Sequence, residues 1–457
     1  MGKLLAIIVV LLAAAGAAWY LAGRADPPVI ESVAPARLIG QSGDLDVTVE
    51  SPGRQLSRLD VTLEQGEARW PVFALPGAEP AQLVEEGEHR LRLAQPIGKR
   101  EVPGLEAGPL TVRVTAVRPV LFGLREIGAS TTHEVEVRLT PPQVGVASQF
   151  HYVNHGGSEM VVYRVRPPDV DSGVRVGDYE YRGYPAAGAG IEGADPGLRV
   201  AFFALMWDQD VNTPISLYAR DEVGNEARAS FDYRVFPKTF RESRITLGDR
   251  LFEKVVPEIL YNSPELKVED PSDLLASFLH INRELRRQNN AQIAALANDT
   301  APEILWQGAF KQLTNTAVEA GFADQRTYVY EGQDVDHQVH LGFDLASTRN
   351  APVLAANSGR VLYAGWLGIY GNCVILDHGM GLQSLYAHLS SVDVALGQDV
   401  DKNDRLGLSG ETGLAGGDHL HFTLLLAGRP VTPIDWWSPQ WIEDRVMRKL
   451  RQAGAAP

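Results

Sequence analysis

The chain begins with a long apolar run. Residues 4–22 carry no charge, and a helix of this length, which rises about 1.5 Å per residue, crosses the hydrocarbon core of a bilayer. A signal peptide usually has a shorter apolar core that ends at small residues, such as those at 15–17. Here the run continues through Trp19 and Tyr20, aromatic residues that favour the membrane interface, and stops at Arg24. The pattern favours an uncleaved anchor, with a cleaved signal as the alternative.

The flanking charges predict an orientation. Lys3 and the N-terminal amine favour retention of the short end on the inner side of the membrane. A buried helix of a soluble domain would usually show a polar face, which this run lacks. We therefore assign residues 1–25 to an anchor or signal and expect the chain after Asp26 to face outward.

Short alternating stretches follow the apolar run. Residues 45–50 and 133–139 alternate apolar with polar side chains, which is the period of a strand with one buried face. A break near Pro119 divides these stretches. We therefore expect two antiparallel β-sandwich domains, one over 27–118 and a second over 119–237.

The second sandwich ends in a predicted hairpin. Residues 223–225 separate the alternating stretches 217–220 and 229–235, and this arrangement resembles the last hairpin of bacterial immunoglobulin-like domains. We expect both sandwiches to be immunoglobulin-like. His151 and His155 are four residues apart near glycines, and we interpret them as solvated loop residues, so this region carries no predicted site.

A helical pattern replaces the strands over 238–325. Asp270 and Pro271 form a helix start signal, with Asp270 as the N-cap. Apolar residues then recur at helical spacing over 274–285. A second helix is expected to begin near Pro302. We interpret both as packing helices of a linker between the β domains and the last segment.

Composition excludes some partners. The chain has 42 basic and 57 acidic residues and a net charge of −15, which is the wrong sign for a nucleic-acid binder. Its single cysteine, Cys373, excludes an intrachain disulfide and lies in an apolar stretch, so we expect an inert core residue. The basic stretch over 445–451 is expected to be a solvated face.

The last segment, 326–457, returns to strands and turns and is rich in histidine. Six of the chain's eleven histidines lie within 85 of its residues. His419 and His421 are two apart in a predicted strand, so their imidazoles share a face. His340 and Asp344 are four apart and share a face on a helix or a strand alike. Together these pairs indicate a metal site.

The donor types indicate which kind of site this is. Two nitrogen ligands and one carboxylate suit Zn²⁺, and three protein ligands leave a fourth position for water, which is typical of a catalytic site. His388 and one histidine of the His-x-His pair are then left for proton transfer. We expect His378 to be structural and His337 to be a solvated loop residue, while Tyr386 either lines the groove or packs in the core.

Short motifs surround these histidines in a constant order. They are 355–361 (AANSGRV), 370–372 (YGN), 377–379 (DHG), 386–389 (YAHL), 409–413 (SGETG) and 419–422 (HLHF).

With these motifs, the chain from about residue 340 to 435 resembles the lysostaphin-like or LytM-type zinc metallopeptidases, which cut peptidoglycan cross-links. The resemblance implies an antiparallel-β catalytic domain in which His340, Asp344 and His421 bind one zinc ion. It also implies that His388 and His419 are the catalytic histidines. All five positions are filled, unlike in degenerate members that only activate other hydrolases.

Two positions depart from the family pattern. Asp418 stands where Pro is usual and Thr423 where Glu is common. Neither change removes a zinc ligand or a catalytic histidine, so the departures concern the choice of substrate.

The resemblance implies a membrane-anchored zinc endopeptidase of the cell envelope that acts on peptidoglycan stem peptides. Upstream domains often cover the groove in this family, so we expect intramolecular inhibition. Because no recognisable wall-binding domain follows the catalytic segment, we expect a single-pass protein of the inner membrane with its bulk in the periplasm. The alternatives are a non-catalytic regulator that binds peptidoglycan or activates a cell-wall amidase, and a structural adhesin that zinc only stiffens.

Overall fold

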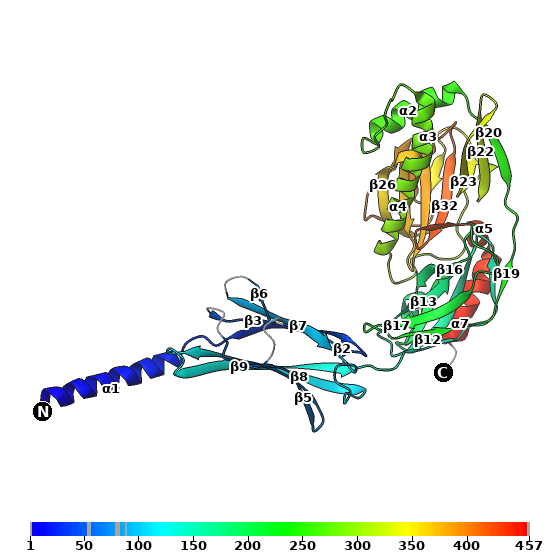
Figure 1. The fold of residues 1–457 in the computed structure, drawn as a ribbon. Helices are drawn as coiled ribbons and strands as arrows, with labels where there is room; N and C mark the ends of the chain where they lie inside the picture. Colours follow the sequence, from blue (N-terminus) through cyan, green and yellow to red (C-terminus); the bar gives the residue numbers. More distant parts are fainter. Residues whose placement is uncertain (1, 53–55, 78–82, 87–88, 455–457) are drawn as a thin grey trace. The chain divides into compact units, whose positions relative to one another are not determined.

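The computed structural model describes residues 2–52, 56–77, 83–86 and 89–454 (Figure 1). The N-terminal helix α1 (Gly2–Ala22) has no buried residue. Among the described residues it is the one helix long and apolar enough to cross a bilayer. The apolar helix expected at this end is therefore present.

The rest of the chain is mainly β and forms two compact units. One unit comprises Met1–Pro142 with Arg220–Glu226, and the other comprises Gln143–Ala219 with Ala227–Pro457. The strands of the first unit are β1 (Val29–Ala34), β2 (Leu38–Ile39), β3 (Gly43–Glu50), β4 (Arg58–Gln65), β5 (Ala68–Leu75), β6 (Leu83–Glu86), β7 (Arg90–Ile97), β8 (Gly108–Val120) and β9 (Arg125–Val137).

Two sheets enclose the core of the first unit, in the orders β1-β3-β7-β6 and β2-β9-β8-β4-β5. The alternation predicted for residues 45–50 is seen in β3, where Leu45, Val47 and Val49 are fully buried. β8 and β9 pair along their whole length, and Pro119 lies within β8 opposite Glu126. The sequence break at this proline is therefore part of a hairpin inside the first unit.

The second unit begins with another set of paired strands. Their sheets have the orders β10-β12-β16-β15 and β14-β13-β17-β18, with β11 and β19 pairing in parallel. These strands are β10 (Gln143–Val146), β11 (His151–Asn154), β12 (Ser158–Arg166), β13 (Asp171–Val176), β14 (Tyr179–Arg182), β15 (Tyr184–Pro185), β16 (Leu198–Ala204), β17 (Ile215–Arg220), β18 (Glu226–Ala229) and β19 (Tyr233–Phe236).

His151 differs from its prediction as a solvated loop residue. It lies in β11 and is only 3% exposed. Its Nδ1 lies 3.0 Å from the Asp232 carbonyl and its Nε2 lies 2.8 Å from Ser148 Oγ. His155 also contacts protein, because its ring packs edge-on against Phe240. The glycines nearby suggested a loop, but tertiary packing buries the imidazole of His151.

Helices follow the sandwich: α2 (Asp249–Asn262), α3 (Leu274–His280), the π-helical turn η4 (Ile281–Leu285) and α4 (Arg286–Leu296). The predicted apolar stripe is confirmed, since Phe278, Ile281 and Leu285 are buried.

Two details of the helical prediction are wrong. The N-cap is Asp273, whose side chain accepts the N–H of Ala276, three residues beyond the predicted cap. Asp270 instead accepts the N–H of Ser272 in the preceding turn. No helix begins near Pro302, because residues 303–316 are irregular and their apolar side chains pack against sheets, with Trp306 and Phe310 buried.

Three further sheets contain the strands of the last segment, together with β20 and β21 from before residue 326. Their orders are β20-β22-β23, β25-β31-β29 and β21-β24-β32-β28-β27-β26-β30, with β33 beside β32. The strands are β20 (Glu242–Thr246), β21 (Ala317–Ala320), β22 (Asp324–Tyr330), β23 (Gln333–His340), β24 (Phe343–Ala346), β25 (Pro352–Leu354), β26 (Gly359–Trp366), β27 (Asn372–Asp377), β28 (Leu382–Leu389), β29 (Ser391–Val392), β30 (Asp399–Val400), β31 (Arg405–Leu408), β32 (Leu420–Leu426) and β33 (Arg429–Val431).

The C-terminal helices α5 (Ile434–Trp437) and α7 (Arg448–Gly454) pack on the sandwich of the second unit. Trp436 is fully buried and contacts Phe202 of β16. Lys449 is 3% exposed, and its Nζ lies 2.9 Å from Oε1 of the buried Glu159. The prediction of a solvated basic face is therefore wrong for Lys449, because the partner that permits its burial lies 290 residues earlier in the chain.

Candidate metal centre

Three predicted ligands converge on adjacent strands. His340 ends β23, Asp344 lies in β24 and His421 lies in β32. Asp344 and His421 are directly opposite each other in the antiparallel pair. His340 Nε2, His421 Nδ1 and Asp344 Oδ1 lie 2.9–3.0 Å from one another. The structure thus brings together, at one point, residues that are up to 81 positions apart.

Hydrogen bonds on the far side of each imidazole decide which nitrogen faces this point. His340 Nδ1 lies 3.0 Å from the Gly321 carbonyl, which can only accept. His421 Nε2 lies 3.0 Å from Thr423 Oγ1, and that hydroxyl donates to the Leu341 carbonyl. Each imidazole therefore carries its proton on the outer nitrogen and turns a lone pair inward.

This donor set fits a cation. Two imidazole lone pairs and one carboxylate oxygen repel one another at these distances unless a positive charge lies between them. The combination of nitrogen and oxygen donors, with three protein ligands, suits Zn²⁺ with one position left for water. His340, Asp344 and His421 would hold the ion.

The backbone of the β23–β24 connection comes close to the ligands. A Cβ atom added at Gly342 would lie 2.5 Å from both His421 Nε2 and Thr423 Oγ1. Only glycine leaves room there for the imidazole and its hydroxyl partner.

Arg326 of β22 holds the second oxygen of the carboxylate ligand. Its guanidinium donates to Asp344 Oδ2 at 3.2 Å. Burial alone would raise the pKa of Asp344, but His340, His419 and His421 outweigh it and hold that pKa well below its usual value. The carboxylate is therefore ionised and oriented with Oδ1 toward the two histidines.

His388 and His419 complete the cluster. Their ring centroids are 4.9 Å apart. Each uses Nδ1–H to donate to a carbonyl at 2.8 Å, that of Thr412 for His388 and that of Gly417 for His419. A neutral imidazole at either position then has an unprotonated Nε2. That of His419 lies 3.5 Å from Asp344 Oδ1 and can donate to this carboxylate once it is protonated.

The two imidazoles differ in how readily they take up a proton. Burial, with the nearby His419 and His421, lowers the pKa of His388 well below its usual value. Burial also lowers the pKa of His419, but the hydrogen bond and charge of Asp344 outweigh it and raise that pKa overall. His388 also has a positive φ of 63°, a strained conformation for a residue with a side chain and one that is common at functional sites. The pair therefore offers one neutral acceptor and one imidazole that takes a proton more readily.

A cavity of about 360 Å³ opens over these side chains. The sheet side supplies the five site residues with Tyr370 and Leu414, and the helical segment supplies Leu251, Phe278 and Arg286. The contribution of the helices was not evident from the sequence, because it depends on packing between segments that are far apart in the chain.

The other predicted residues lie outside the cluster. His378 is fully buried, with Ser358 O and Ser384 Oγ each 2.7 Å from its ring nitrogens, in keeping with a structural role. Cys373 is buried and free. Tyr386 is buried and accepts the N–H of Ala356, so it packs in the core. His337 is exposed but lies in strand β23, not in a loop.

The segment that carries the cluster matches a known protein family. Residues 338–433 match Peptidase family M23. The chain is 38% identical over 97 residues to the DD-carboxypeptidase/endopeptidase Mpg of Neisseria meningitidis serogroup B, covering 21% of this chain and 22% of that protein. It is 40% identical over 92 residues to the peptidoglycan DD-endopeptidase ShyA of Vibrio cholerae, covering 20% of this chain and 21% of that protein.

The chain thus spans about a fifth of the length of these curated relatives. Among solved structures, the catalytic domain of the antimicrobial peptidase lysostaphin from Staphylococcus simulans is 26% identical, with a TM-score of 0.25. The match covers 29% of this chain and 98% of that domain.

Proposed function

Because residues 338–433 form a domain of peptidase family M23, we propose that this chain is a zinc metalloendopeptidase that hydrolyses peptide cross-links of peptidoglycan. The observation that carries the proposal is the convergence of two imidazole lone pairs and one carboxylate oxygen beside two further histidines. One relative is named a DD-carboxypeptidase/endopeptidase and another a peptidoglycan DD-endopeptidase. We therefore propose that the bond cleaved by this chain is also of the DD type.

A zinc ion at this site would supply a bound water of lowered pKa and would polarise the scissile carbonyl. His340, Asp344 and His421 would hold the ion, and Arg326 keeps the carboxylate in place. The unprotonated Nε2 atoms of the two remaining histidines orient the attacking water and take up its proton. The histidine that accepts this proton passes it to the leaving amine, and the other donates to the oxyanion when it is protonated.

Purified peptidoglycan sacculi test this assignment. We expect the zinc-loaded chain to convert cross-linked dimers into monomers, which mass spectrometry of the released fragments identifies together with the bond cut. His388→Ala should abolish cleavage and retain zinc, while the exposed His337→Ala should leave cleavage unchanged. Zinc retention with an intact fold and no fragments from the unmodified chain would instead favour the non-catalytic regulator.

We also propose that the helical segment 249–296 restrains the peptidase. It lines the cavity over the metal centre. Lys254 Nζ donates to Glu411 Oε2 at 2.7 Å and to the Ala415 carbonyl at 3.2 Å, in the loop that leads to His419. On the other side, Asn289 Oδ1 accepts the N–H of Ile369. A long cross-linked substrate would have to displace these contacts to enter.

For the N-terminal part we propose a single-pass anchor in the inner membrane, with immunoglobulin-like sandwiches that position the peptidase in the periplasm. Helix α1 has no buried residue. At the tip of the β8–β9 hairpin Phe122 and Leu124 are 103% and 70% exposed. Arg118 of β8 donates to the Asp26 carbonyl at 2.8 Å, just beyond the helix. The apolar tip is therefore at the same end of the first unit as helix α1, which is the end that would face a bilayer.

Mass spectrometry of the chain recovered from membranes decides between anchor and signal. An intact N-terminus, in a protein that carbonate washing does not release, supports the anchor. A new N-terminus near residues 15–17 would instead identify a cleaved signal.

A further inference from the structure

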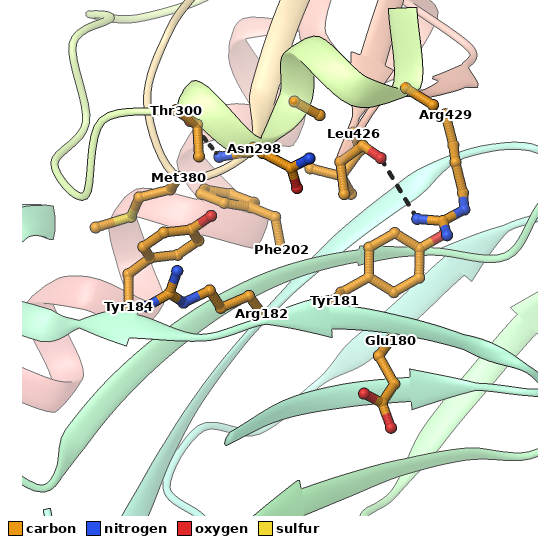
Figure 2. Close-up of a pocket in the computed structure, with 14 residues that line it drawn as sticks. Glu180, Tyr181, Arg182, Tyr184, Phe202, Asn298, Thr300, Met380, Leu426 and Arg429 are labelled. Atoms are coloured by element: carbon orange, nitrogen blue, oxygen red, sulfur yellow. Dashed lines mark hydrogen bonds between the residues drawn. The ribbon is translucent and has the colours of Figure 1, made fainter. Parts of the chain in front are cut away.

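A second cavity, of about 380 Å³, lies in the second unit away from the metal centre (Figure 2). Strands β14 and β16 of the sandwich form one wall, and the end of α4 and the end of β32 form the other. His421 is the second residue of β32 and Leu426 is the last, so the two positions are about 17 Å apart along the strand. The cavity is therefore separate from the peptidase site.

Two arginines line this cavity, and neither guanidinium forms an ion pair within the described residues. Arg429 stacks over Tyr179 at 4.4 Å from the ring centroid, and Arg182 stacks over Tyr184 at 5.9 Å. Stacking uses the flat face of a guanidinium and leaves N–H groups on its edge. One of those of Arg429 donates to the Ala427 carbonyl at 3.4 Å, and the others are available. Figure 2 shows the two groups on opposite sides of the cavity.

The acidic groups nearby already have partners. Glu180 accepts from Arg175 Nε at 3.1 Å, and Figure 2 shows its carboxylate turned away from the cavity. Asp377, behind Thr300, accepts from that hydroxyl at 2.8 Å and from the Ala301 N–H at 2.7 Å. The guanidinium groups of Arg182 and Arg429 are therefore the charged groups on the cavity wall that have no acidic partner within the described residues.

A buried donor also lacks a partner there. The hydroxyl of Tyr181, a residue 1% exposed, has no hydrogen bond within the described residues. Burial raises the pKa of Tyr181, so the hydroxyl keeps its proton. An unpartnered buried hydroxyl costs free energy that a bound acceptor would restore. Figure 2 shows this hydroxyl beside the guanidinium of Arg429.

The surface between the two arginines is suited to a short organic molecule. Phe202, Met380 and Leu426 are apolar, and the side-chain amide of Asn298 offers both a donor and an acceptor to a peptide group. We propose that this cavity binds a short peptide with two carboxylates, one held by Arg429 and Tyr181 and the other by Arg182. Binding here does not depend on the proposed peptidase reaction.

Calorimetric titration of the full zinc-loaded chain in detergent tests this site. The probe is N-acetyl-glutamyl-alanine, which carries two carboxylates, and its control is the uncharged N-acetyl-glutaminyl-alaninamide. We expect saturable binding of the first and at least about tenfold weaker binding of the second, because each lost charged hydrogen bond costs about a factor of ten or more. Absence of binding, or equal binding of both peptides, would overturn the proposal. Tighter binding of pyrophosphate than of the dipeptide would overturn its assignment to a peptide.

Variants locate the binding. Arg429→Gln and Arg182→Gln should each weaken binding of the dipeptide about tenfold, whereas Arg360→Gln, which removes a surface partner of Asp399, should not. Unchanged binding of the dipeptide by the Arg429→Gln variant would contradict the proposed binding site.

Tyr181→Phe separates a ligand-binding role from a structural one. Without ligand it should unfold at the same or a higher temperature, since it removes an unpartnered buried hydroxyl, and it should bind the dipeptide more weakly. A lower unfolding temperature with unchanged binding would show that the Tyr181 hydroxyl does not take part in binding the dipeptide.

Discussion

Thr423 links a metal ligand to the protein backbone. It accepts the Nε2–H of His421 and donates to the Leu341 carbonyl, so it decides which nitrogen of His421 faces the ion. In the sequence, Thr423 stands out only as a departure from the family pattern. In the structure the shorter hydroxyl serves as an outer-shell acceptor for a ligand.

Thr423→Val keeps the shape of this side chain and removes the acceptor. We expect zinc affinity to fall by about tenfold to a hundredfold, as is typical when an outer-shell partner is lost. Competition with a chromophoric chelator measures the effect. Thr423→Ser, which keeps the hydroxyl, should stay within a few-fold of the unmodified chain, and equal zinc affinity in the Val and Ser variants would contradict this role.

We expect the buried imidazole of His378 to account for part of the loss of stability in acid. Burial lowers its pKa to about 4, while in the unfolded chain the pKa is about 6.5. Between these values the unfolded state binds the extra proton, so the free energy of unfolding falls as the pH falls from about 6.5 to about 4. A difference of this size corresponds to about 3 kcal/mol from this one residue.

Urea unfolding at several pH values measures this contribution. His378→Gln should be less stable at neutral pH but should lose less stability across the same acid range. An identical pH slope in both proteins would show that His378 does not carry the effect.

At the scale of elements, the helices α2 to α4 connect the region before the peptidase to the rim of its metal centre. Lys254 is the contact best suited to a test, because its ammonium bonds both a side chain and a backbone carbonyl of the rim. Lys254→Ala should loosen α2 over the cavity and raise the rate of sacculus cleavage several-fold. Lys267→Ala, which removes a bond only to the Pro264 carbonyl of the same segment, is the matched control.

An equal rate for Lys254→Ala and the unmodified chain would argue against restraint by this segment. Zinc content measured in both proteins keeps a change in metal loading from being mistaken for a change in access.

At the scale of the whole second unit, a buried ion pair joins the C-terminal helix to the sandwich. Lys449 Nζ bonds Glu159 Oε1 and the Met160 carbonyl. Burial raises the pKa of Glu159, and the lysine partly offsets that increase. Lys449→Met removes the nearest cation from this buried carboxylate, leaving Arg445 Nε 3.9 Å from Glu159 Oε2, and should cost about 3–5 kcal/mol of stability.

The denaturant midpoint measures this loss. The double variant Lys449→Met with Glu159→Gln should recover part of it, since no buried charge is left without a partner. Arg448→Met, on the exposed side of the same helix, should change stability by less than about 1 kcal/mol. A loss in the exposed variant as large as in Lys449→Met would exclude the buried pair as the cause.

The predictions that succeeded rest on local spacing. Residues two apart in a strand share a face, and both His419 and His421 do approach Asp344, although β32 begins only at Leu420. The buried stripe that includes Phe278 and Leu285 followed from helical periodicity. The cap at Asp273 and the irregular chain after Pro302 were missed, since start signals recur within a few residues and apolar spacing alone does not separate a helix from a packed loop.

The donor set, the apolar first helix and the mainly β character are properties of short stretches, so the amino-acid order alone determines them. The orientations of His340, His421 and His388 are decided by the carbonyls of Gly321, Leu341 and Thr412, which come into reach only when separate strands and loops pack together. The burial of Lys449 and the second cavity likewise depend on surfaces from distant segments. These features depend on the tertiary structure, because a hydrogen bond or a buried charge is defined by the atoms that surround it and not by the neighbours in the chain.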